Sequence, residues 1–325
     1  MKRRDWLLAS AALVVAPLAR AQAPRPRRVA IGTPRVPDPA DSDPGGVRKR
    51  LAELGWVEGR TIEYVTGYAH EDAKRWEPMI IELLARKPDV LFVSFGGMAR
   101  IAMRHTKDVP IVFAIASNPE KLGIVASLAR PGGNVTGVST REQELVGKRV
   151  ELIREITPGV RRIAMLANPD NPVTSRIYLE NYSAEARKLG IEVRAYDARS
   201  AEELRPAFER MRGDGMQGLL CIADPFQLRA KHELAAHAAR LRLTAVYPIG
   251  EFVQAGGLAS YGTDLLDQYR RAANYVDKIL RGAKPADLPV QEPTSFELAI
   301  NARAAREQGF RIPQSVLIRA TKVIE

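Results

Sequence analysis

The sequence predicts an α/β protein made of two doubly wound parallel-sheet lobes that are joined by a multi-strand hinge. The chain has 325 residues, more than one hydrophobic core usually organises. Short β-rich runs alternate with longer amphipathic helical patterns, which is typical of parallel sheets covered by helices on both faces. This alternation stops at the breaker Arg130-Pro-Gly-Gly-Asn134 and then starts again, which predicts a second sheet of the same kind.

The first half of the chain is predicted to form one lobe of alternating strands and helices. Runs rich in β-branched and apolar residues are interpreted as strands, and runs with apolar residues every three or four positions as helices. The predicted strands are 28–32, 61–68, 90–94 and 110–116, and the predicted helices are 46–54, 71–85, 98–105 and 119–128.

The second half repeats this alternation. Its predicted strands are 162–167, 192–197, 218–223 and 244–248, and its predicted helices are 142–155, 173–189, 201–211 and 228–241. The tail adds a strand at 257–261, a helix at 264–281, an extended proline-rich stretch at 287–294 and a last helix at 301–308.

The tail is too short for a third domain, so its elements are expected to complete the two sheets. The chain then crosses between the lobes near 134–140, 260–264 and 289–295. This assigns 28–137 with 263–288 to an N-terminal lobe, and 138–262 with 289–325 to a C-terminal lobe. Several crossings form a hinge, and a hinge between two lobes creates a cleft that closes on a ligand.

Residues 1–21 are predicted to be an export signal peptide. The basic run Lys2-Arg3-Arg4 precedes an apolar run from Trp6 to Leu18, and small residues follow, with cleavage expected after Ala21. Thirteen helical residues rise only about 20 Å, too short for a hydrocarbon core of about 30 Å. The paired arginines resemble a twin-arginine signal, and the general secretion route stays open. The mature protein is therefore expected in the periplasm, and Cys221, in an apolar run, is expected to be a buried thiol.

The charge does not indicate a nucleic-acid partner. The whole chain carries a formal +11, of which the leader holds +3, and the remaining charge forms no dense Lys/Arg block. A transcription regulator would need a helix-turn-helix before the first strand, and only about seven residues separate Ala21 from that strand.

No catalytic, cofactor or metal-binding motif is found. The run Gly213–Gly218 has the spacing of a dinucleotide fingerprint, but it precedes a strand instead of following one. His232 and His237 are five positions apart and diverge on a helix, which is a poor metal-ligand spacing. No nucleophile elbow or phosphate loop occurs in the sequence. The chain is therefore predicted not to be an enzyme.

Polar and aromatic residues recur where predicted strands end, and these positions are the predicted ligand site. Ligands of open α/β sheets bind beyond the carboxyl ends of the strands, and helix N-termini there hold anions. Helix capping is the alternative interpretation for each of these loops. The predicted ligand-binding set is Ser94, Gly96, Gly97, Ser117, Asn118, Asn168, Asp224, Tyr247 and Tyr261.

Several longer stretches resemble a bacterial family of ABC-transporter substrate-binding proteins, often labelled tryptophan/tyrosine uptake components. The most characteristic one is VASLARPGGNVTG at 125–137. The other similar stretches are 53–60, 89–93, 251–262, 275–289 and 296–301. The resemblance implies a type I periplasmic-binding-protein fold, no catalysis, no cofactor, and delivery of a small solute to an ABC permease in the cytoplasmic membrane.

One difference from this family concerns the ligand. Many members have Asp-Pro where this chain has Asn118-Pro119, and a neutral amide cannot make the charge-assisted bond that an ammonium group needs. The expected ligand is a small polar solute, with an aromatic amino acid as one candidate. Asp224 and Asn168 are expected to recognise it from one lobe, and Ser94 and Ser117 to hold an anionic group from the other.

The expected protein is a monomeric periplasmic receptor. A ligand sensor of the same fold that feeds a signalling partner, and an exported α/β enzyme, are the alternatives. The ligand, the cognate permease and the resting angle of the cleft stay open.

Overall fold

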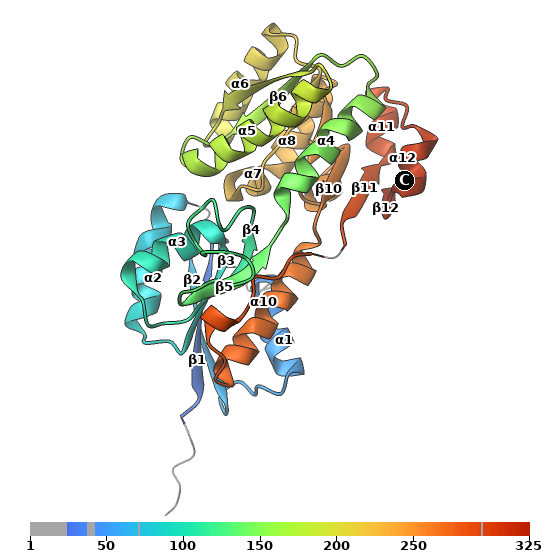
Figure 1. Cartoon of the computed structure of the whole chain (residues 1–325). Coiled ribbons are helices and arrows are strands. Elements are labelled where there is room, and N and C mark those ends of the chain that lie inside the picture. The colour runs from blue at the N-terminus through green and yellow to red at the C-terminus, as the bar shows by residue number, and fades with distance from the viewer. Residues whose placement is uncertain (1–24, 38–42, 71, 294) are drawn as a thin grey trace, which may run out of the picture.

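The computed structural model describes residues 25–37, 43–70, 72–293 and 295–325, so the predicted signal peptide lies outside the described residues. The chain forms two lobes, each with a β-sheet between layers of helices (Figure 1). The fold class predicted from the sequence is confirmed.

The N-lobe contains a five-stranded, fully parallel sheet in the order β2-β1-β3-β4-β5. Helices α2 and α3 cover one face of the sheet, and α1 and α10 cover the other. Because both faces are covered, β4 is buried at every position. The strands are β1 (Arg27–Thr33), β2 (Ile62–Tyr68), β3 (Val90–Phe95), β4 (Ile111–Ala116) and β5 (Val135–Ser139). The helices are η1 (Pro44–Gly46), α1 (Val47–Glu53), η2 (Ala73–Arg75), α2 (Trp76–Ala85), α3 (Gly96–His105), α10 (Leu265–Leu280) and η3 (Pro285–Asp287).

The C-lobe contains a seven-stranded sheet in the order β12-β11-β10-β9-β8-β6-β7. Strand β11 runs antiparallel to β10, so this sheet is mixed where the sequence predicted a parallel one. The strands are β6 (Arg162–Ala167), β7 (Glu192–Asp197), β8 (Gly218–Leu220), β9 (Thr244–Tyr247), β10 (Ala259–Gly262), β11 (Glu297–Asn301) and β12 (Lys322–Ile324). The helices are α4 (Glu142–Ile156), α5 (Pro172–Lys188), α6 (Ala201–Gly213), α7 (Pro225–Arg229), α8 (Lys231–Arg240), α9 (Glu251–Gln254), α11 (Ala302–Gln308) and α12 (Gln314–Arg319).

The helix predicted at 119–128 does not form. The segment consists of turns in which the amides of Ile124 and Val125 both donate to the carbonyl of Pro119. Gly123 has a φ of +67°, a left-handed conformation that ends a helical run. The turns bury Ile124 and Val125 against the N-lobe core, which explains why the amphipathic pattern there resembled a helix.

Strand β8 is shorter than the predicted strand 218–223. Beyond Leu220, the side chain of Gln227 replaces the ladder: its amide oxygen accepts from Ile222 N and its amide nitrogen donates to Leu166 O. The buried Gln227 therefore supplies hydrogen-bond partners for main-chain groups that would otherwise be unpaired where the chain leaves the sheet.

The hinge consists of connections that lie close to one another. Strand β5 continues to Ser139, two residues past position 137, where the sequence predicted the first N-lobe segment to end. Gln291 pairs with this strand: Ser139 N donates to Gln291 O (2.8 Å), and Gln291 N donates to Gly137 O (3.1 Å). Arg149, fully buried on α4, donates from Nε to the carbonyl of Tyr261 at 2.7 Å. This bond connects α4, which follows the crossing after β5, to β10, which precedes the crossing to α10.

We predict that Gly262→Ala destabilises the protein, because a Cβ at this hinge position would lie 1.8 Å from the carbonyl oxygen of Pro248. A clash with the backbone is not relieved by a rotamer change, so a loss of about 1–3 kcal/mol in the free energy of unfolding is expected. Urea unfolding measures this loss. Gly133→Ala is the control because nothing lies within 4 Å of its Cβ position, and equal losses in both variants would contradict the prediction.

Candidate ligand-binding site between the lobes

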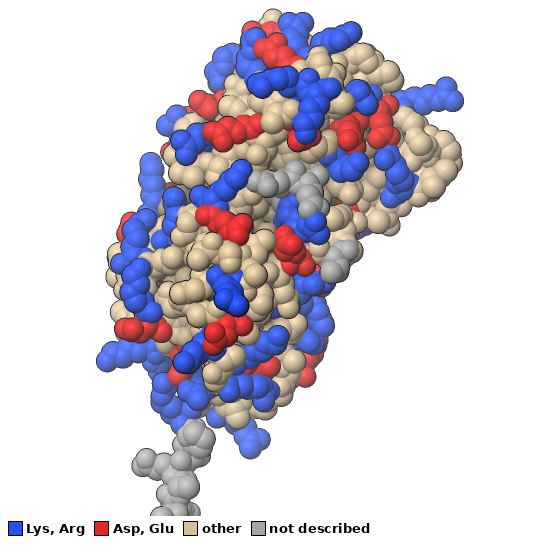
Figure 2. Space-filling view, in the orientation of Figure 1, with Lys and Arg blue, Asp and Glu red and all other residues tan. Residues whose placement is uncertain are grey.

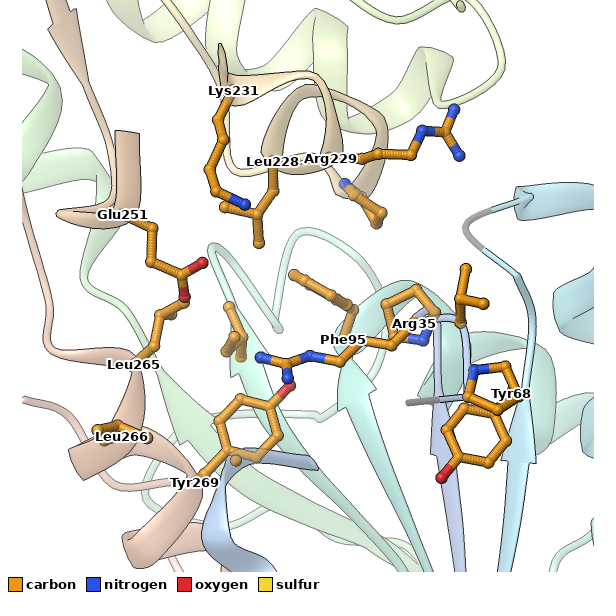
Figure 3. A pocket seen from close by; sticks show the side chains of 16 residues that line it. Arg35, Tyr68, Phe95, Leu228, Arg229, Lys231, Glu251, Leu265, Leu266 and Tyr269 are labelled. Carbon is orange, nitrogen blue, oxygen red and sulfur yellow. The ribbon is translucent and has the colours of Figure 1, made fainter. Parts of the chain in front are cut away.

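The carboxyl ends of the two sheets face each other, and a cavity of about 520 Å³ lies between them. We call this cavity the aromatic compartment. This size is within the range of about 300–1,000 Å³ that is usual for small-molecule sites. Its lining comes from both lobes, and α10 contributes to it on the N-lobe side. The lining residues are Pro34, Arg35, Val36, Pro37, Gly45, Tyr68, Phe95, Ile115, Pro225, Leu228, Arg229, Lys231, Glu251, Leu265, Leu266 and Tyr269 (Figure 3).

Aromatic rings form much of the wall on the N-lobe side. Tyr68 ends β2 and Phe95 ends β3, so the parallel strands deliver both rings to the same edge. Tyr269 projects from α10 and packs against Phe92 with ring centroids 5.8 Å apart. Gly45 has a φ of +73°, and a Cβ there would meet the Tyr269 ring at 2.1 Å. The glycine thus allows the chain to pass over this ring.

Charged side chains of both signs reach the same cavity. Lys231 begins α8 and Glu251 begins α9, and both side chains extend from the C-lobe toward the cavity (Figure 3). Neither makes a hydrogen bond or an ion pair with any residue that the structure describes. Arg35, in the loop after β1, extends toward Tyr269. The cavity therefore combines an apolar wall with charged side chains of both signs.

A second cavity of about 360 Å³, which we call the amide compartment, also lies between the lobes. It shares Pro225 and Arg229 with the aromatic compartment. The guanidinium of Arg229 lies over the ring of Phe226 at 5.8 Å. The N-lobe supplies Asp72, Ala73, Trp76, Gly97, Arg100 and Ile101, and the C-lobe supplies Asn168, Asp170, Asn171, Pro172, Val173, Arg199, Asp224 and Phe226 as well as the two shared residues.

The carboxylate of Asp224 is the centre of a buried hydrogen-bond network in the C-lobe. It accepts from the amide group of Asn168 at 3.1 Å and from that of Asn171 at 3.2 Å. It also caps α7 by accepting from the backbone N–H groups of Phe226 and Gln227. Burial raises the pKa of Asp224, and these donors act in the opposite direction. The network fixes the loops after β6 and β8 against each other.

Three residues of the predicted set, Gly97, Asn168 and Asp224, line the amide compartment. Ser117 and Asn118 instead line a smaller cavity of about 210 Å³, together with Arg141 and Glu292. The hydroxyl of Ser117 lies 3.2 Å from that of Tyr178 on α5, which is a hydrogen bond across the lobes.

The other four residues of the predicted set lie outside these three linings. Ser94 is fully buried and its hydroxyl has no partner among the described residues, and Gly96 packs against Ala116. Tyr247 is in the C-lobe core, where its ring stacks on Phe252 at 4.7 Å. Tyr261 packs against Phe296, and its carbonyl accepts from Arg149.

The sequence interpretation missed several residues of the aromatic compartment. Arg35 and Glu251 follow strands β1 and β9, so the rule about carboxyl ends would have found them if it had been applied to every strand. Lys231 follows α7, and Tyr269 is on the buried face of α10, so no comparable signal exists for them.

The described part of the chain shows neither a metal-binding cluster nor a helix suited to a membrane. No group of three or more His, Cys, Asp and Glu residues there is arranged to hold a metal ion. No helix within the described ranges combines the length and the apolar character that crossing a membrane requires.

Comparison with known proteins identifies the family. A sequence model described as "ABC transporter substrate binding protein" matches residues 28–324. The chain belongs to this family of substrate-binding proteins.

Solved structures share the two-lobed fold. One is a protein from Streptococcus pneumoniae, described as an ABC domain in complex with L-Trp, with 27% identity and a TM-score of 0.83 over 92% of this chain and 100% of that one. Another is a conserved domain protein of Vibrio cholerae, with 28% identity and a TM-score of 0.83 over 91% of this chain and 99% of that one. A "Tyrosine-binding protein" of Clostridioides difficile is 25% identical over 256 residues, which cover 79% of this chain and 73% of that protein.

Membership confirms the resemblance seen in the sequence and the predicted role as a substrate-binding protein of an ABC transporter. Proteins of this family bind a small molecule and work with a transporter, and they generally act outside the cytoplasm. The family is one of binding proteins and not of enzymes.

We predict that Asp224→Asn destabilises the protein by about 1–3 kcal/mol, the range for a buried polar group left without a partner. One oxygen of the carboxylate would become an NH₂ group, which would face the NH₂ groups of Asn168 and Asn171. Thermal and urea unfolding measure the loss. Asp170→Asn is the matched control because its carboxylate is exposed, and an equal effect in the two variants would contradict the assigned network.

Proposed function

We propose that the protein is the periplasmic receptor of an ABC uptake system and that it binds an aromatic amino acid in the aromatic compartment. The observation that carries this proposal is a cavity between two hinged lobes that combines a wall of aromatic rings with charges of both signs. An aromatic amino acid has the complementary groups, an apolar ring and a zwitterionic head group. The similar proteins that are described with L-Trp or as tyrosine-binding support this ligand class.

The proposed mechanism is capture by closure. Ligand enters while the lobes are apart, and rotation about the hinge brings the rings of the N-lobe onto a ligand held by the C-lobe. Burial of the ring excludes water and strengthens the polar contacts to the head group. The hydrogen bond between Ser117 and Tyr178 lies across the lobes, so it belongs to the contacts that such a rotation changes.

The remaining parts of the proposal come from the sequence. The protein is exported by the signal at 1–21, acts as a monomer, carries out no chemistry on its ligand, and delivers it to a permease in the cytoplasmic membrane. On the face shown in Figure 2, basic and acidic side chains are interspersed over both lobes. On this face, the mixture of charges forms no continuous basic patch of the kind that a nucleic acid would need.

We predict that L-tryptophan or L-tyrosine stabilises the purified protein. A ligand present at one hundred times its dissociation constant should add about 2.7 kcal/mol to the free energy of unfolding. Differential scanning fluorimetry against amino acids, purines and small carboxylates measures this effect. Stabilisation by a purine or a simple carboxylate, without any by aromatic amino acids, would contradict the ligand class.

We predict that Phe95→Ala weakens the binding of the aromatic amino acid about 10- to 100-fold. The ring is at the end of β3 in the cavity wall, and losing the burial of one large apolar side chain costs about 1.5–3 kcal/mol. Isothermal titration calorimetry measures the affinity. The control is Phe296→Ala, a half-buried ring outside the lining, and equal losses in the two variants would place the ligand elsewhere.

A further inference from the structure

Lys231 and Glu251 are the charged C-lobe residues whose side chains extend into the aromatic compartment in Figure 3. Both are only partly exposed, and neither side chain has a hydrogen-bond or ion-pair partner among the described residues. Withdrawing an ion from water without a partner is costly. A ligand that brings the complementary charges would remove this cost.

Asp224, an acidic residue of the amide compartment, is less suited to this role. Asp224 is 2% exposed, and its carboxylate already accepts hydrogen bonds from Asn168, Asn171 and the first turn of α7. Among the described residues that line the aromatic compartment, Glu251 is the acidic one. A cationic group that enters this compartment would therefore meet Glu251.

The aromatic rings of this compartment lie on the N-lobe side, which also contributes Arg35, and Lys231 and Glu251 lie on the C-lobe side. The rings come from β2, β3 and α10 on the N-lobe side, whereas Lys231 and Glu251 come from the loops and helices that follow β8 and β9. Leu228 lies beside Lys231 on the C-lobe side of the compartment (Figure 3). A ligand with a charged head group and an aromatic ring can therefore place its head group at Lys231 and Glu251 and its ring against the rings of the N-lobe.

We propose that Glu251 and Lys231 are the specificity-determining pair for the head group of the ligand. Glu251 binds the α-ammonium group and Lys231 binds the α-carboxylate, so the C-lobe captures the zwitterion before the N-lobe closes over the side chain. The inference rests on the proposed function, because it assumes that an aromatic amino acid is the ligand. It adds that both head-group charges are required and that separate residues recognise them.

Three ligands test the assignment by calorimetry on the mature protein: L-tryptophan, tryptamine, which lacks the carboxylate, and indole-3-propanoate, which lacks the ammonium group. The variants are Glu251→Gln and Lys231→Gln. The matched controls are Glu297→Gln and Lys322→Gln, because these residues line the neighbouring cavity beside the hinge, which Lys231 and Glu251 also line, but not the aromatic compartment.

The wild-type protein should bind L-tryptophan at least about tenfold more tightly than either analogue, since a hydrogen bond to a charged group is worth at least that factor. Glu251→Gln should weaken the binding of L-tryptophan about 10- to 100-fold and leave the affinity for indole-3-propanoate within about threefold of the wild type. Lys231→Gln should weaken the binding of L-tryptophan and of indole-3-propanoate, which both carry a carboxylate, and leave the affinity for tryptamine unchanged. Retained binding of one analogue shows that each variant is folded.

Three results would overturn the assignment, the first two by themselves and the third together with the proposed ligand class. If the wild type binds L-tryptophan but Glu251→Gln weakens it no more than Glu297→Gln does, the head group is bound elsewhere and only this inference fails. The same conclusion follows if Glu251→Gln weakens L-tryptophan and indole-3-propanoate equally. If neither the wild type nor any variant binds an aromatic amino acid, the inference fails together with the proposed ligand class.

Discussion

Parallel strands end at the same edge of a sheet, and in this protein a short hinge holds the carboxyl ends of the parallel strands of the two lobes facing each other. Main-chain pairing between Gln291 and β5 keeps two of the connections side by side. The buried guanidinium of Arg149 holds the carbonyl of Tyr261 at the neighbouring connection. The residues that follow the parallel strands, such as Arg35 and Glu251, are brought into the space between the lobes by this arrangement.

Two sets of polar groups between the lobes have different physical roles. The Asp224 network is internally satisfied: amide groups and helix N–H groups use the carboxylate, so its contribution is to the shape and rigidity of two loops. Lys231 and Glu251 have no partners among the described residues, so their electrostatic free energy is available to a ligand. In the proposed site, the rigid loops are preorganised and the unpaired charges await those of a ligand.

The sequence predicted the fold class and much of the element order because alternating apolar strands and amphipathic helices are a repeated signal. It predicted that polar residues collect at carboxyl ends, and Gly97, Asn168 and Asp224 do line one cavity. The sequence did not show on which face of a strand a terminal side chain lies. Tyr247 and Phe95 both end strands, but Tyr247 lies in the core of the C-lobe whereas Phe95 lines the cavity. Tyr269 reaches the cavity only through tertiary packing of α10, for which no local pattern exists.

Closure of the two lobes over an aromatic amino acid is the central claim, and a distance between the lobes tests it most directly. Cysteines introduced at the exposed positions Lys74 and Arg176 carry spin labels on the N-lobe and the C-lobe, and the native Cys221 is fully buried and should not react. Pulsed electron resonance then measures the distance distribution with and without L-tryptophan. The account predicts a shorter and narrower distribution when the ligand is bound. An unchanged distribution at saturating ligand would contradict it.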